Sequence, residues 1–136
     1  MTAGVNLGKH GNLGKIGNLG NLGMKTSKAS FNRFKAEFLR WVDLFGLKDY
    51  RVYFALKKLD SIAHISIDEG GKVVNVTLAN ELTKEDAQES IESHAKHEVL
   101  HLLLNRLVWI GGCRYISDSE LQDEWERLVI RLEKVI

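Results

Sequence analysis

The chain has 136 residues, with 19 basic and 18 acidic side chains, a net charge of +1 and one cysteine, Cys113. This length allows one domain with a hydrophobic core, and the balanced charge argues against a nucleic-acid partner. The lone cysteine excludes an intramolecular disulfide and fits a reducing compartment. With no apolar run long enough for a bilayer and no signal core, we expect no membrane partner and a cytoplasmic location, the host cytoplasm if a phage encodes the chain.

Residues 1–23 differ from the rest, because glycine recurs at every third position from Gly8 to Gly23. The chain contains no proline, which argues against a collagen triple helix. A polar repeat of this kind buries too little surface to offset its ordering entropy. We expect a disordered tail here and a single domain over residues 24–136. The repeat is also typical of translated repetitive DNA, which makes Met24 a candidate for the native initiator.

The first half of this domain predicts a helix followed by three strands. From Ser30 to Phe45, apolar residues recur at three- and four-residue spacing, and Gly46 is typical of a helix end. The turn-forming residues 69–72 would join the second and third strands into a hairpin. The three alternating, β-prone runs lie at residues 50–56, 63–67 and 73–78.

The second half predicts two helices. Thr83 and Asp86 resemble a capping box, from which one apolar helix would run to about Leu107. A second capping box at Ser117 would begin the last helix. The overall order predicts an α+β fold, with helices packed on a small antiparallel or mixed sheet. The residues expected to point inward from the last helix are Leu121, Trp125, Leu128, Val129, Leu132 and Ile136.

The segment His97-Glu98-Val99-Leu100-His101 specifies a chemistry. Residues four apart in a helix lie on nearly the same face, so both imidazoles can bind one metal ion. Glu98 lies beside them and can act on a water without being a ligand, as zinc hydrolases require. The alternative is that both histidines pack in the core without metal. We favour the metal site, because a helix apolar nearly all round is normally buried and buried unpaired imidazoles are unfavourable.

The third metal ligand has to come from elsewhere in the chain. No histidine follows His101, so the three-histidine pattern of the metzincins is excluded. The last helix offers several carboxylates. By helical position, Glu124 flanks the apolar stripe more closely than Glu126 does.

The histidine segment and Glu126-Arg127-Leu128-Val129 in the last helix resemble small zinc metallopeptidases of phages and prophages, which are minimal zincins of the gluzincin type. The resemblance covers roughly residues 31–136, and its specific part is the His97–His101 segment. It implies a zincin-like arrangement of helix, three-stranded sheet, active-site helix and C-terminal helix. It also implies one zinc ion held by His97, His101 and Glu126, with Glu124 as the rival third ligand.

The expected activity is hydrolysis of peptide bonds in a protein or peptide substrate, with Glu98 as the general base toward a zinc-activated water. We expect the strand at residues 73–78 to line the cleft and to pair with the peptide through its edge. Candidates for stabilising the oxyanion are His94, Arg114 and Tyr115. The alternative function is a catalytically idle, zinc-stabilised module that binds a partner protein. The oligomeric state stays open.

Overall fold

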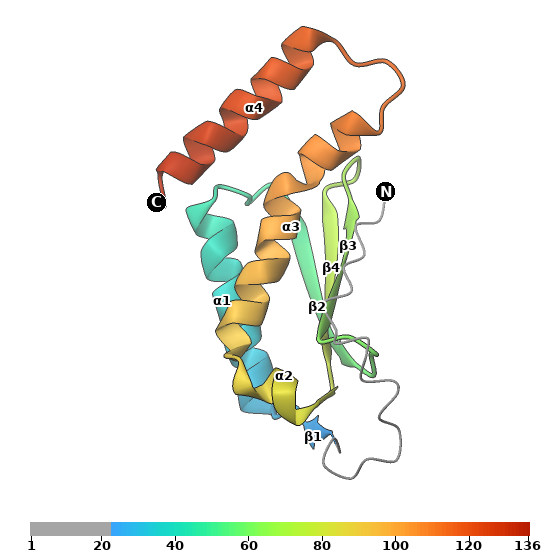
Figure 1. The fold of residues 1–136 in the computed structure, drawn as a ribbon, viewed down its shortest axis with the longest axis vertical. Helices are drawn as coiled ribbons and strands as arrows, with labels where there is room; N and C mark the ends of the chain where they lie inside the picture. The colour runs from blue at the N-terminus through green and yellow to red at the C-terminus, as the bar shows by residue number, and fades with distance from the viewer. Residues whose placement is uncertain (1–22) are drawn as a thin grey trace.

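The computed structural model describes residues 23–136, which form an α+β fold (Figure 1). The expectations for residues 1–22 lie outside the described part. No described helix is long and apolar enough to cross a membrane. In chain order the elements are β1 (Met24–Lys25), α1 (Lys28–Leu44), β2 (Arg51–Lys57), β3 (Ala63–Asp68), β4 (Val73–Ala79), β5 (Glu81–Leu82), α2 (Lys84–Gln88), α3 (Ile91–Gly111) and α4 (Asp118–Glu133).

The three predicted strands form one mixed sheet with the order β2-β4-β3. β3 and β4 are antiparallel, as the predicted hairpin requires, and Ile65 lies opposite Val76. β2 pairs with the other side of β4 in parallel. Because β4 is paired on both sides, the free edges of the sheet belong to β2 and β3. β1 and β5 form a separate two-stranded ribbon that the sequence analysis did not predict.

Two helices, α1 and α3, pack side by side on the same face of this sheet (Figure 1). The sequence places large apolar residues on the inner side of α1, where Phe38 packs edge-on against Phe54 of β2, with the ring centroids 5.4 Å apart. The fully buried residues of the strands alternate with polar ones, which is the pattern of a sheet covered on one face only. The core therefore lies between the sheet and the α1–α3 pair.

The single helix predicted from Thr83 to Leu107 is wrong, because the structure divides it into α2 and α3. Glu89 is extended and ends α2. The Ser90 hydroxyl then accepts a hydrogen bond from the Ser93 backbone N–H and caps a new helix. A serine that can cap satisfies the free N–H groups of a helix start, so it competes with continuation of the preceding helix.

The predicted inward stripe of α4 is also largely wrong. Leu128 is buried and Leu132 half-buried, whereas Trp125 has 63% of its surface exposed. The helix crosses the end of α3 rather than lying along the sheet (Figure 1). It therefore has only a short contact with the core. The other residues predicted inward, Leu121, Val129 and Ile136, are exposed.

Candidate metal centre

The helix α3 brings His97 and His101 together. Their Nε2 atoms lie 3.1 Å apart, with the ring centroids at 4.9 Å. Two nitrogens bound to one tetrahedral zinc at about 2.0–2.1 Å would lie roughly 3.3 Å apart, so the pair fits a shared ion. Burial, followed by the neighbouring His97, lowers the pKa of His101. This favours the neutral imidazole that metal binding requires.

The carboxyl group of Glu98 is completely buried, and both of its oxygens lack a hydrogen-bond partner among residues 23–136. Burial raises its pKa from 4.5 to about 8. Most buried polar groups in folded proteins are hydrogen-bonded, and burying a carboxyl group without a partner costs stability. Packing alone therefore does not explain why a glutamate occupies this position. In the sequence Glu98 lies between the two histidines, and a carboxyl pKa raised by burial is common at catalytic positions.

The structure does not bring a third ligand to the histidines. Among residues 23–136, no group of three or more His, Cys, Asp or Glu side chains could hold a metal ion. Glu124 is buried and accepts hydrogen bonds from Arg127 Nε at 2.8 Å, while Arg106 Nε lies 3.2 Å away. Glu126 is exposed. The role of third metal ligand stays a prediction, with Glu126 and Glu124 as the two candidates.

The α4 carboxylates do not meet the histidines because the two sets of residues lie on different sides of α3. Arg106 and Leu103, which contact α4, lie roughly 140–200° around the helix from His101 at about 100° per residue. α4 therefore packs on the opposite side of α3 from the histidine pair. Lys96, on the side away from the histidines, lies over the Trp41 ring of α1. The histidine side thus faces away from both neighbouring helices.

The predicted role of the strand at residues 73–78 needs correction. This strand is β4, whose two edges are already hydrogen-bonded to β2 and β3. It has no free edge for a peptide. The strand that α3 contacts is β3, which is paired on one side only. The edge nearest α3 is therefore that of β3.

The contacts of the three oxyanion candidates do not support a direct role for any of them in stabilising an oxyanion. His94 is buried, with Nε2 3.2 Å from the Asp86 carbonyl and Nδ1 3.6 Å from a Glu89 oxygen. Arg114 and Tyr115 are exposed in the segment between α3 and α4. The structure thus gives His94 a contact with α2, which the spacing to His97 did not indicate.

A polar cluster close to the histidines was missed. Glu69, at the β3–β4 turn, is buried and accepts hydrogen bonds from Tyr50 at 2.6 Å and Asn105 at 3.0 Å. Lys72 also donates to it. Asn105 stands one helical turn after His101, so the cluster fixes this part of α3 against the sheet. The signal available in the sequence was the polar pair Asn105-Arg106 within the apolar run of residues 102–110.

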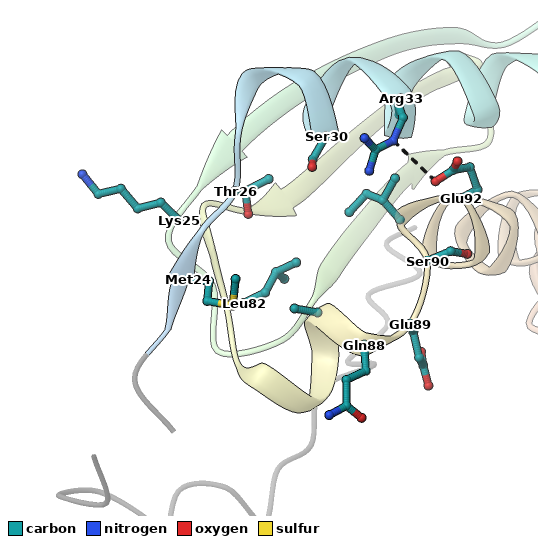
Figure 2. A pocket seen from close by; sticks show the side chains of 12 residues that line it. Met24, Lys25, Thr26, Ser30, Arg33, Leu82, Gln88, Glu89, Ser90 and Glu92 are labelled. Carbon is teal, nitrogen blue, oxygen red and sulfur yellow. Dashed lines mark ion pairs between the residues drawn. The ribbon is translucent and has the colours of Figure 1, made fainter. Parts of the chain in front are cut away.

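A separate pocket lies at the end of the molecule opposite α4, between β1, the start of α1 and the α2–α3 junction (Figure 1 and Figure 2). Its volume is about 420 Å³, and it contains neither histidine. The ion pair of Arg33 and Glu92, 3.7 Å apart, spans it. Because the two charges face each other, the pocket offers no uncompensated charge to a ligand from this pair.

The chain matches no protein-family model, no curated protein and no solved structure in the comparisons made.

Proposed function

We propose that the chain is a zinc-dependent metallopeptidase of zincin-like arrangement, with His97 and His101 as metal ligands and Glu98 as the general base. The observation that carries this proposal is the combination of two imidazole Nε2 atoms 3.1 Å apart with the buried carboxyl group of Glu98, one residue after His97, which has no hydrogen-bond partner among residues 23–136. A structural zinc site would normally use four protein ligands and would not require such a base.

The chemistry divides between the metal and the chain. Zinc in a site with an open position polarises a carbonyl and lowers the pKa of a water to about 7. Glu98 would take the proton from the attacking water and return it to the leaving amine. Burial raises the pKa of this carboxyl group to about 8 in the metal-free protein, and a divalent cation nearby would lower it toward the carboxylate form that a base requires.

The third ligand in this proposal is a carboxylate of α4. Glu126 is the better candidate, because it is exposed and has no hydrogen bond or ion pair within residues 23–136. Glu124 would have to leave Arg106 and Arg127, which would then be left partly unpaired. Breaking a buried charge pair typically costs about 3–5 kcal/mol, which disfavours Glu124.

The substrate would be an extended peptide segment paired with the free edge of β3. An edge strand offers unpaired backbone N–H and C=O groups, which bind a peptide independently of its side chains. The histidines lie on the side of α3 that faces away from α1, so a peptide on this edge would pass beside them.

Replacing Glu98 by Gln tests the assignment of the base. The variant should keep zinc and lose hydrolysis of a fluorogenic peptide mixture, because glutamine has nearly the same shape but cannot accept the proton. Glu133→Gln, an exposed change in α4, is the matched control and should retain full activity. Cleavage by Glu98→Gln at the wild-type rate would refute the role of Glu98.

The same variant separates the alternative function, a zinc-stabilised module that binds a protein. The exposed apolar residues on α3 and α4, such as Val108 and Trp125, favour a protein contact in either case. If wild type and Glu98→Gln both hold zinc and neither cleaves any peptide, the binding module is the better description.

A further inference from the structure

The first side of α4 contacts its own chain, and an exposed apolar stripe runs along the border of this side. On the first side, Glu124 contacts Arg106, Leu128 is buried, and Arg131 donates to the Gly46 carbonyl at 3.1 Å. These contacts hold α4 across the end of α3 and α1. Along the border, Leu121, Trp125 and Val129 recur every four residues and are exposed, with Leu121 seven residues before Leu128.

The helix α3 carries a similar exposed stripe beside the histidines. Leu100, Leu104 and Val108 recur every four residues and are exposed, Val108 to 57%. At about 100° per residue, His97 and His101 lie within the same third of the helix surface as this stripe. The histidine pair therefore lies on an apolar surface. No helix within residues 23–136 covers this surface.

The two stripes match in length and chemistry. Each spans nine residues, or about 12 Å between its end residues along a helix, and each is formed by large apolar side chains. Exposed apolar ridges of this length on a small domain are typical of protein contacts. In α4, Glu126 lies next to Trp125 on the flank of the stripe. In α3, the histidines lie on the flank of the stripe.

The charges also complement each other. Within α4, six carboxylates stand against two guanidinium groups, whereas α3 carries two of each sign besides its histidines. A divalent cation on the histidine pair would make the α3 face positive. The strongly acidic α4 would then be attracted to it. Glu126 is free to contribute, since nothing within residues 23–136 pairs with it.

Within one chain, Glu126 cannot reach the histidines from the observed position of α4. This helix contacts α3 at Leu103 and Arg106, two residues that lie on the opposite side of α3 from the histidines. The α4 of a second molecule can approach the histidine side of α3 directly. Its exposed stripe of Leu121, Trp125 and Val129 is not covered by any other described part of its own chain.

We propose that the metal centre is completed between two copies of this chain: Glu126 of one copy binds the ion held by His97 and His101 of the other. This inference rests on the proposed function, since it names the source of the third ligand. The exchange is reciprocal, so a two-fold dimer contains two such centres and buries both pairs of stripes.

Mixing two defective variants tests this arrangement, with zinc alone as the probe. Glu126→Ala lacks the ligand but keeps the histidines, and His101→Ala lacks a histidine but keeps Glu126. Each variant alone should bind zinc more than about 100-fold more weakly than wild type, beyond the 10–100-fold loss typical of an outer-shell change. Their equimolar mixture should regain tight zinc binding at one ion per mixed dimer. Asp123→Ala, an exposed change elsewhere on α4, should bind zinc like wild type.

Sedimentation of the same samples tests the dimer. Wild type should be a dimer with zinc, and Trp125→Glu should be a monomer with weakened zinc binding; its residue is exposed, so the fold is not at risk. A wild-type monomer with tight zinc, or a mixture that does not regain zinc binding, would overturn the shared centre while leaving the peptidase proposal intact. Wild type that binds no zinc at all would overturn both.

Discussion

Glu98 is the residue whose environment is hardest to explain by packing. Its carboxyl group is fully buried and has no hydrogen-bond partner in the described part of the chain, and burial raises its pKa to about 8. A hydrophobic residue of similar size would avoid this cost, so the glutamate is a liability for stability in the metal-free protein. Such costs are typical of catalytic positions, where selection acts on chemistry rather than on stability.

The cost of Glu98 predicts a pH-dependent effect of Glu98→Gln on the metal-free protein. The folded-state pKa is about 8 against an ordinary 4.5, so the folded state binds the proton more tightly. Wild-type stability should therefore be full below about pH 4.5 and fall as the pH rises to 8. The variant should gain a few kcal/mol over wild type at pH 9, at about 1.4 kcal/mol per pKa unit, and little at pH 5.

Urea unfolding with a chelator at both pH values measures this difference. Glu133→Gln, exposed at the end of α4, should follow wild type at each pH. An equal free energy of unfolding for wild type and Glu98→Gln at pH 9 would show that the buried carboxyl group is not a liability.

At the scale of elements, a buried charge cluster holds α3 and α4 to the sheet. Glu69 at the β3–β4 turn accepts hydrogen bonds from Tyr50, Asn105 and Lys72, and Arg106 lies 3.8 Å from it. Arg106 also contacts Glu124 of α4. Through this chain of contacts, the position of α3 beyond the histidines depends on one turn of the sheet.

We predict that Glu69→Gln destabilises the protein by about 3 kcal/mol at pH 7, because it leaves buried or half-buried donors without their charge partner. Burial alone would raise the pKa of Glu69, but hydrogen bonds from Lys72, Tyr50 and Asn105 outweigh it and lower the pKa below 4.5. The stabilisation is therefore present above pH 4.5 and is lost as the pH falls through the folded-state value.

Chemical denaturation of wild type and variant between pH 3 and 7 checks this, and the difference should shrink toward pH 3. Asp60→Asn, an exposed loop change, serves as the control with little effect. A difference that stays constant over the whole range would contradict the assigned charge role.

The sequence predicted elements better than it predicted their contacts. Alternation located β3 and β4, because one covered face imposes a period of two, and the turn at residues 69–72 fixed their pairing. It could not give the parallel pairing of β2 with β4, which depends on a long connection through β3. The histidine spacing followed from helix geometry alone, whereas the position of α4, and so the third ligand, depends on tertiary contacts such as that of Glu124 with Arg106.

At the scale of the whole molecule, the fold leaves the histidine side of α3 open. The sheet and α1 cover the other sides, and α4 crosses only the end of α3 (Figure 1). An ion bound on this open side would link to folding, because only the folded helix holds both imidazoles at 3.1 Å.

We therefore predict that zinc stabilises the protein against thermal unfolding. At a free zinc concentration about 100 times Kd, the gain should be about 2.7 kcal/mol. His97→Ala should show none of this gain, while its metal-free Tm should be close to wild type because His97 is exposed. An equal zinc-induced shift in His97→Ala would place the ion elsewhere.

The most direct test of the metal centre is the metal content of protein purified without chelator and without added zinc. Elemental analysis should find about one zinc per chain in wild type and almost none in the His97→Ala, His101→Ala double variant, with both samples folded by circular dichroism. Wild type without zinc, or a double variant that retains the wild-type amount, would contradict the account.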